Sequence, residues 1–175
     1  MLPRHPDQST RIFFASRWDD SKGAPELLIL AEAIQRQYPE AVLVGLDWGT
    51  HANAARTAGL QLLPLMSTDD FRQEIANADI VIGQVAFGAL GLSDLEAMAQ
   101  ARPLVARFTL DEEYGSPAPL FNTDNAPAMT LVERILSDPE GAAEIALAGR
   151  AWALEHHGSH ILQARLEGIY QQLLS

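Results

Sequence analysis

The sequence predicts a doubly wound α/β domain, in which helices cover both faces of a parallel sheet. Strand-like and helix-like segments alternate five times along the chain, and most of the connections between them are short. Short connections of this kind favour right-handed crossovers between parallel strands. The clearest unit, residues 78–107, reads as strand, glycine loop, helix, turn and strand, and the other segments can be arranged around it.

The first half of the chain alternates short apolar runs with amphipathic stretches. Leu27, Leu30, Ala31 and Ile34 recur at helical spacing, and Pro39 ends the helix that they predict. The segments expected in this half are, in order, a loose lead-in over 1–10, a strand over 11–16, a helix over 24–38, a strand over 41–47, a helix over 52–58, a strand over 60–65 and a helix over 68–77 capped by Ser67.

The central unit contains the most distinctive local pattern. Residues 79–83 form a β-branched apolar run, typical of a strand buried on both faces. The glycines of the loop 88–92 give the backbone the freedom for a tight turn close to a ligand. Ser93 and Glu96 fit the S-x-x-E capping-box pattern, which predicts a helix from Asp94 to about residue 101. A glycine loop that feeds a helix N-terminus at the carboxyl end of a parallel strand is an anion-binding arrangement.

The last third of the chain is predicted to be mostly helical. A buried strand over 104–107 is followed by an irregular stretch, 108–125, which contains three consecutive acidic residues and two prolines. Three helical segments are then expected over 126–137, 139–156 and 159–174. At 175 residues the chain is long enough to bury a core, and we predict a single Rossmann-like domain over 1–175 with additional C-terminal helices.

Composition narrows the possible partners. No apolar run reaches the roughly 18 residues of a membrane-spanning helix, and the polar N-terminus is not expected to act as a signal or transit peptide. The chain has no cysteine, so it has no disulfide and no thiolate ligand, and a cytoplasmic location fits best. Its formal charge of −11 argues against a nucleic-acid partner, because a phosphate backbone requires a basic surface.

Three loops are expected at the carboxyl edge of the sheet, where ligands of doubly wound domains bind. They are residues 17–23, 48–51 and 84–92. An anion bound by so acidic a chain has to be held by a few local positive groups, and Arg17 and Lys22 lie in the first of these loops. Guanidinium and ammonium groups both suit a phosphate, although the same two residues could be ordinary surface charges.

With these loops in place, the chain from about Arg11 onward resembles the C-terminal, donor-binding half of GT-B glycosyltransferases of the retaining family 4 type. Arg17 and Lys22-Gly23 match that family's G-R-x-x-x-x-K-G loop, and Ala78-Asp79 match the A-D that precedes a strand. Further matches to the G-L-x-x-x-E-A-M-A…x-P-V-V signature and to the C-terminal helices are found at Gly91-Leu92, Glu96-Ala97-Met98-Ala99, Arg102-Pro103-Leu104-Val105, Asp138-Pro139-Glu140, Gly149-Arg150-Ala151-Trp152 and Tyr170.

The resemblance implies roles for individual residues. Arg17 and Lys22, together with the backbone N–H groups of Gly91 and Leu92, would hold the diphosphate of a UDP-, GDP- or ADP-linked sugar. Glu96 would accept hydrogen bonds from the ribose hydroxyls, although as part of a capping box it could also have a purely structural use.

The resemblance also implies contacts with the base and the sugar. Leu65 and Met66, after the third strand, would lie beside the base. His51, on a loop at the ligand edge, and Gly88 are possible donor contacts. Gly88 stands where the family has the first glutamate of its E-x7-E motif, which usually contacts the donor sugar. No metal, cofactor or catalytic side chain is expected, and the acceptor site would be supplied by an N-terminal GT-B domain in cis or in trans.

Two classes of function follow. The first is the nucleotide-sugar-binding half of a retaining hexosyltransferase, which would be incomplete without the acceptor domain. The alternative is a catalytically inactive nucleotide-binding or interaction module of the same fold. A nucleotide-sugar epimerase is a third possibility, but the C-terminal helices and the Glu96–Ala99 segment favour the transferase family.

Overall fold

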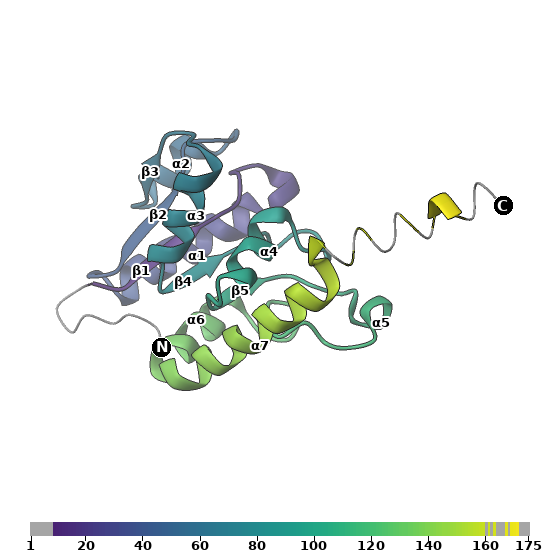
Figure 1. Ribbon diagram of the computed structural model, residues 1–175. Helices are drawn as coiled ribbons and strands as arrows, with labels where there is room; N and C mark the ends of the chain where they lie inside the picture. The colour runs from purple at the N-terminus through teal and green to yellow at the C-terminus, as the bar shows by residue number, and fades with distance from the viewer. Residues whose placement is uncertain (1–8, 160, 162, 164–166, 168, 172–175) are drawn as a thin grey trace.

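The computed structural model describes residues 9–159, 161, 163, 167 and 169–171, and it is an α/β structure built on six parallel strands (Figure 1). The strands are β1 (Arg11–Phe14), β2 (Val42–Leu46), β3 (Gln61–Leu63), β4 (Ile80–Ile82), β5 (Leu104–Ala106) and β6 (Phe121–Asn122). The helices are η1 (Asp20–Lys22), α1 (Ala24–Gln37), α2 (Ala52–Thr57), α3 (Thr68–Asn77), α4 (Leu92–Ala99), α5 (Asp111–Tyr114), α6 (Ala128–Ser137) and α7 (Pro139–His157).

The strand order is β3-β2-β1-β4-β5-β6, with every neighbouring pair parallel. The chain therefore winds outward from β1 in one direction, returns to the centre, and continues in the other direction from β4. In this register Phe13 of β1 is paired with Val44 of β2 on one side and with Val81 of β4 on the other. The crevice outside the carboxyl ends of β1 and β4 is the switch point where such sheets bind ligands.

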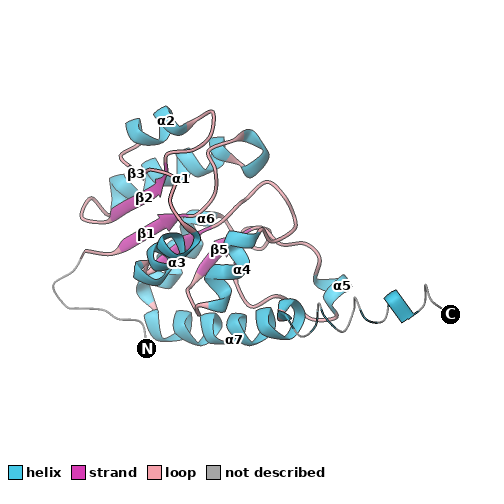
Figure 2. Cartoon of the chain, turned by 45° about the horizontal axis from the view of Figure 1, so that its top comes forward, coloured by secondary structure: helices cyan, strands magenta, loops and turns pink. Residues whose placement is uncertain are grey.

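The sheet is buried on both faces, as its β-branched strands predict. Alternate residues of β1 point to opposite sides, so that Ile12 and Phe14 join one core and Phe13 joins the other. The first core is closed by α1, α2 and α6, and the second by α3, α4 and α7. Figure 2 shows α3 and α4 in front of the sheet, with α7 running along the lower edge of the view.

The predicted fold class is confirmed, and the structure adds one strand to it. Residues 108–125 were expected to be irregular, but they contain the short helix α5 and the two-residue strand β6, which extends the sheet beyond β5. Each of the five predicted strands is present, and its ends lie within two residues of those expected. Residues 1–8 of the lead-in expected over 1–10, and most of the helix expected over 159–174, lie outside the described residues. No described helix is long and apolar enough to cross a membrane.

Helix α7 supports α4, the helix that begins at the glycine loop. The two helices pack together at Gly149, where the absence of a side chain lets α7 approach the backbone of residue 119. A Cβ atom added at Gly149 would lie 2.7 Å from the carbonyl oxygen of Pro119 and 3.5 Å from the Met98 side chain. The Pro119 backbone cannot move aside as a flexible side chain could. The contact at Gly149 therefore sets how closely α7 approaches Pro119 and the neighbouring Met98 of α4.

We predict that Gly149→Leu lowers the free energy of unfolding by about 1–3 kcal/mol, because the added atoms force α7 away from Pro119. Ala148→Leu is the matched control, since Ala148 precedes Gly149 on the same helix and is exposed. This control should change stability by no more than about 0.5 kcal/mol. Urea unfolding followed by circular dichroism measures both, and equal stabilities of the two variants would contradict the packing described.

Candidate functional site

A cavity of about 580 Å³ opens at the carboxyl edge of the sheet. Its walls come from the segments that follow β1, β2 and β3 and from the first turns of α4. We call it the main cavity, and its lining residues are Ala15, Ser16, Arg17, Lys22, Leu46, Trp48, Leu65, Met66, Ser67, Thr68, Phe71, Gly91, Leu92, Ser93 and Glu96. The location is the one that the rule for open parallel sheets predicts.

Most of the residues proposed from the sequence converge on the main cavity. Those that line it are Arg17, Lys22, Leu65, Met66, Gly91, Leu92 and Glu96. Gly88 lies instead in a second cavity of about 410 Å³, which we call the side hollow. The residues around the side hollow are Lys22, Phe87, Gly88, Ala89, Leu90, Gly91, Thr109 and Leu110. Lys22 and Gly91 border both spaces.

His51 lines neither of the two cavities. Its Nε2 atom lies 2.8 Å from the Asp20 carboxylate, and the backbone N–H of His51 donates to Trp18. These contacts tie the loop after β2 to the loop after β1. The structure therefore gives His51 a role in holding two loops together and does not place it against either cavity.

Arg17 extends from the loop after β1 and is about 40% exposed. Its Nε atom lies 3.5 Å from Asp19 Oδ2, and its guanidinium carbon lies 5.0 Å from the centre of the Trp48 ring. Backbone hydrogen bonding from Thr50, with a smaller contribution from Arg17, lowers the pKa of Asp19. The Asp19 carboxylate therefore stays charged near neutral pH and helps to hold the loop.

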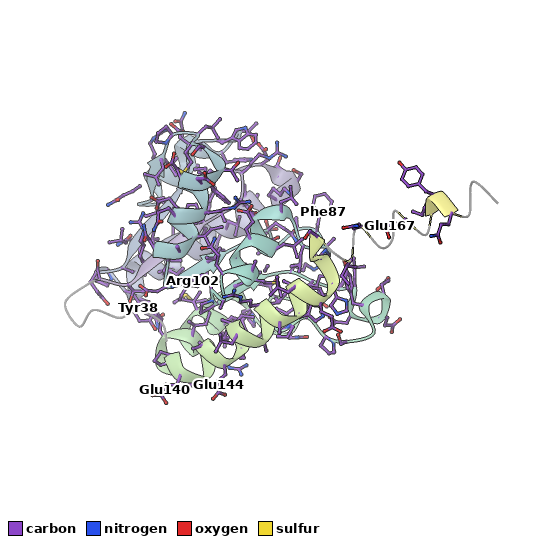
Figure 3. All side chains as sticks on the ribbon, viewed as in Figure 1. Tyr38, Phe87, Arg102, Glu140, Glu144 and Glu167 are labelled. Carbon is purple, nitrogen blue, oxygen red and sulfur yellow. The ribbon has the colours of Figure 1, made fainter. Side chains whose placement is uncertain are left out.

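Lys22 is the only lysine in the chain. It ends η1, and the left-handed backbone of Gly23 then turns the chain into α1. Lys22 makes no ion pair with any described residue, and its Nζ atom lies 5.7 Å from the centre of the Phe87 ring. Phe87 projects outward from the glycine loop (Figure 3). The ammonium group is thus available to an anion at the border of the two cavities.

The N-terminus of α4 differs from the sequence prediction. The helix begins at Leu92, with Gly91 as its N-cap, and the predicted capping box between Ser93 and Glu96 does not form. The carboxylate of Asp94 instead accepts the Gly91 N–H at 2.8 Å. Both patterns fit the local sequence, and burial decides between them because Asp94 is fully buried while Glu96 is turned toward Arg72.

This hydrogen bond also redirects an amide that was expected to hold a phosphate. The Gly91 N–H points to Asp94, although Gly91 itself lines the main cavity. The N–H groups of Leu92 and Ser93, in the first turn of α4, have no hydrogen-bond partner among the described residues. These two amides and the positive end of the helix dipole are what α4 offers to an anion.

A second buried polar side chain, Gln84, shapes the same loop. It lies two residues after the end of β4 and is almost completely buried. Its amide nitrogen donates to the carbonyl oxygens of Phe87, Ala89 and Arg107 at 2.7–3.1 Å, and its oxygen accepts the Phe87 N–H at 2.6 Å. Every polar atom of the side chain is satisfied, so the loop has one preferred conformation. Gln84 was not predicted to be a site residue, although a polar residue that follows a predicted buried strand can indicate such a position.

Glu96 is positioned by α3. Its Oε1 atom accepts a hydrogen bond from Arg72 Nη2 at 3.2 Å, and its side chain is about 28% exposed. Its other oxygen, Oε2, is buried and has no hydrogen-bond partner among the described residues. A buried carboxylate oxygen without a donor is costly, and a ligand hydroxyl would reach it only after the Glu96 side chain turns toward the main cavity.

The wall opposite α4 is apolar. Leu65 is about 62% exposed, and Met66 and Phe71 are partly buried beside it. Trp48, on the loop after β2, completes this side. Apolar walls with a few directed polar groups are typical of small-molecule sites. Among the described residues, no group of three or more His, Asp or Glu side chains is arranged to hold a metal ion.

Comparison with known proteins identifies the fold. No family model matches the sequence, and no curated protein matches it either. Solved structures do match: sucrose-phosphate synthase from Thermosynechococcus elongatus has a TM-score of 0.72 at 19% identity, and Anabaena HepE in complex with UDP has 0.72 at 17% identity. Staphylococcus aureus TarM, in complex with UDP among other ligands, has 0.68 at 16%. The chain has the fold of the C-terminal half of a GT-B glycosyltransferase.

The match covers nearly all of this chain but only part of the others. The three alignments span 94–96% of this chain, against 46% of the synthase, 49% of HepE and 37% of TarM. The chain therefore spans less than half the length of these GT-B chains. At identities of 16–19% the similarity establishes the fold of the chain, while the residues of its cavities have to be argued from their own geometry.

The buried Asp94 makes stability depend on pH. Burial raises the pKa of the Asp94 carboxyl from 3.8 to about 6, against the opposing effects of the Gly91 N–H and of Lys22. The folded protein therefore holds this proton more tightly than the unfolded chain does. Raising the pH from about 4 to about 6 removes the proton from the folded state, so stability falls as the pH rises through this window.

We predict that Asp94→Asn removes this pH-dependent loss, because the amide oxygen can still accept the Gly91 N–H but carries no charge. Between pH 4 and pH 7 the wild type should lose up to about 3 kcal/mol of unfolding free energy relative to the variant. Urea unfolding at both pH values measures it. Comparing differences cancels any constant effect of the substitution, and a difference that does not change with pH would contradict the prediction.

Proposed function

We propose that this chain is the donor-binding half of a retaining glycosyltransferase and that it binds a nucleotide-diphosphate-sugar. One observation carries the proposal: the main cavity of a highly acidic chain brings together Arg17, Lys22 and the free amides of an α-helix. The GT-B fold and the UDP present in two of the similar structures support it. An N-terminal GT-B domain, in cis or in trans, would supply the acceptor site.

The proposed chemistry is electrostatic. When a glycosyl group leaves a nucleotide-sugar, negative charge grows on the nucleoside diphosphate. Arg17, Lys22 and the N–H groups of Leu92 and Ser93 would stabilise this charge, since they are already in place before the bond breaks. This mechanism needs no nucleophilic side chain from the donor-binding half.

The nucleoside would lie along the other wall of the main cavity. The ribose hydroxyls would donate to the carboxylate of Glu96, which lines the main cavity. The base would pack beside Leu65 and Met66, which offer apolar surface near the end of β3. The sugar would extend toward the side hollow, because Lys22 and Gly91 border both spaces.

Gly88 favours the alternative function, a module that binds a nucleotide without transferring sugar. A Cβ atom at this position would lie 1.9 Å from Thr109 Oγ1 and 3.1 Å from Thr109 Cβ, so the loop is built around a glycine here. A carboxylate-bearing side chain at position 88 would require Thr109 to move. The two functions can be distinguished by pairing the chain with an acceptor domain and measuring transfer of sugar to an acceptor. Only a transferase would consume the donor and transfer its sugar.

We predict that a nucleoside diphosphate binds more tightly than the matching monophosphate or nucleoside and that binding weakens with salt. Arg17→Ala and Lys22→Ala should each weaken the diphosphate by about 10- to 150-fold, equivalent to roughly 1.5–3 kcal/mol for a charge-assisted hydrogen bond. Calorimetric titration with UDP, UMP and uridine measures this. Arg36→Ala, on an exposed turn of α1, is the control for loss of one positive charge.

Equal affinity for uridine and UDP, or an equal loss in all three variants, would remove the phosphate-site interpretation. Lys22 offers an independent readout because the chain has no other lysine. An amine-selective acylating reagent should modify Lys22 in the free protein, and bound UDP should slow that modification.

For Glu96 we predict that Glu96→Gln weakens a ribonucleoside diphosphate about 10-fold, on the order of 1.5 kcal/mol, because an amide presents a donor where the hydroxyls require an acceptor. The loss should be smaller for the 2′-deoxy ligand, which has one hydroxyl fewer. Asp69→Asn is the matched control, since Asp69 is the other carboxylate beside Arg72 and does not line the main cavity. If Glu96→Gln binds both ligands as tightly as the wild type does, the ribose role is wrong.

A further inference from the structure

Trp48 differs from the other tryptophans of the chain. Trp18 is fully buried and donates its indole N–H to the carbonyl oxygen of Leu46, and Trp152 is about 5% exposed within the second core. Trp48 is about 46% exposed and lines the main cavity. A large aromatic ring left in water at the mouth of a cavity is costly, and it calls for an explanation other than core packing.

The ring of Trp48 lies against the Arg17 guanidinium. The distance from the guanidinium carbon to the ring centre is 5.0 Å, within the roughly 6 Å range of a cation–π contact. Asp19 also approaches Arg17, at 3.5 Å, but a carboxylate neutralises the charge and occupies an N–H donor. An aromatic face holds the cation without using any of its donors.

The backbone beneath Trp48 is fixed to the loop that carries Arg17. The Trp18 N–H donates to the Trp48 carbonyl at 2.9 Å, and the His51 N–H donates to the Trp18 carbonyl at 2.8 Å. Between them, Gly49 has a φ angle of +119°, and a Cβ atom on it would lie 2.6 Å from the Trp18 backbone. Because the two loops are joined by backbone contacts, the Trp48 and Arg17 side chains extend from backbones whose separation is fixed.

We propose that Trp48 is a positioning residue whose ring holds the Arg17 guanidinium at the mouth of the main cavity, so that its N–H donors stay directed toward a bound diphosphate. This proposal rests on the proposed function, since it assumes that the main cavity binds a diphosphate. In this proposal Trp48 increases the affinity for the phosphate groups of a ligand, whichever base the ligand carries. Because Trp48 acts only by orienting Arg17, its contribution to affinity disappears when Arg17 is removed.

The test is a double-mutant cycle read with two ligands. Wild type, Trp48→Leu, Arg17→Ala and the double variant are titrated calorimetrically with UDP and with inorganic pyrophosphate, which has no base. Trp48→Leu should weaken both ligands alike, by about 2- to 5-fold, the range expected for an exposed cation–π contact. In the Arg17→Ala background the same substitution should change neither affinity. Trp48→Tyr keeps an aromatic face and should retain most of the wild-type affinity.

Other outcomes overturn the proposal. Losses that add in the double variant, or a loss for UDP with pyrophosphate unchanged, would mean that Trp48 contacts the ligand directly. If the wild type binds both ligands and Trp48→Leu changes neither affinity, the positioning role is wrong, while the proposed function is unaffected. Wild type that binds neither ligand would overturn both. The thermal midpoint of each variant confirms folding, and Trp48→Gln repeats the cycle if the leucine variant does not fold.

Discussion

The hydrogen bond between the Gly91 N–H and the buried Asp94 carboxylate determines where α4 begins. A carboxylate in this position is expensive, because it is removed from water and one of its oxygens has no partner among the described residues. This cap places the first turn of the helix at the edge of the main cavity, where the N–H groups of Leu92 and Ser93 have no hydrogen-bond partner among the described residues. Gln84 fixes the preceding loop in the same way, so two buried polar side chains shape the whole β4–α4 connection.

The distribution of charge follows a related pattern. Many arginines of this acidic chain are paired with a carboxylate, as in Arg11–Glu74, Arg56–Asp47, Arg72–Glu96 and Arg107–Asp124. At the main cavity the pairing is looser, since Lys22 makes no ion pair with a described residue and Arg17 contacts the Trp48 ring as well as Asp19. Surface ion pairs contribute little to stability, so the lack of one at Lys22 costs the fold little and leaves its positive charge available for a ligand.

The parallel sheet and the position of the cavity could be predicted from the sequence, because both depend on patterns that repeat. Strands buried on both faces appear as apolar runs, and loops after parallel strands meet at one edge, which was enough to bring Arg17, Lys22 and Glu96 together. The sixth strand is only two residues long, and no pattern can be read from two residues. The start of α4 was misplaced because Ser93–Glu96 and Gly91–Asp94 both fit a cap, and the choice depends on long-range burial. Trp48 was passed over for the same reason, since its contact with Arg17 joins two loops distant in sequence.

The contact between Gly88 and Thr109 constrains how the side hollow could change over evolution or in the laboratory. A Cβ atom built on Gly88 would lie 1.9 Å from Thr109 Oγ1, which a turn of the threonine about its χ1 angle can move away, and 3.1 Å from Thr109 Cβ, which that turn leaves in place. A side chain at position 88 therefore requires Thr109 to adjust, and a smaller residue at position 109 is permissive for it. Libraries that vary positions 88 and 109 together, including Thr109→Gly and Thr109→Ala, would sample side chains at position 88 with less strain than libraries of position 88 alone.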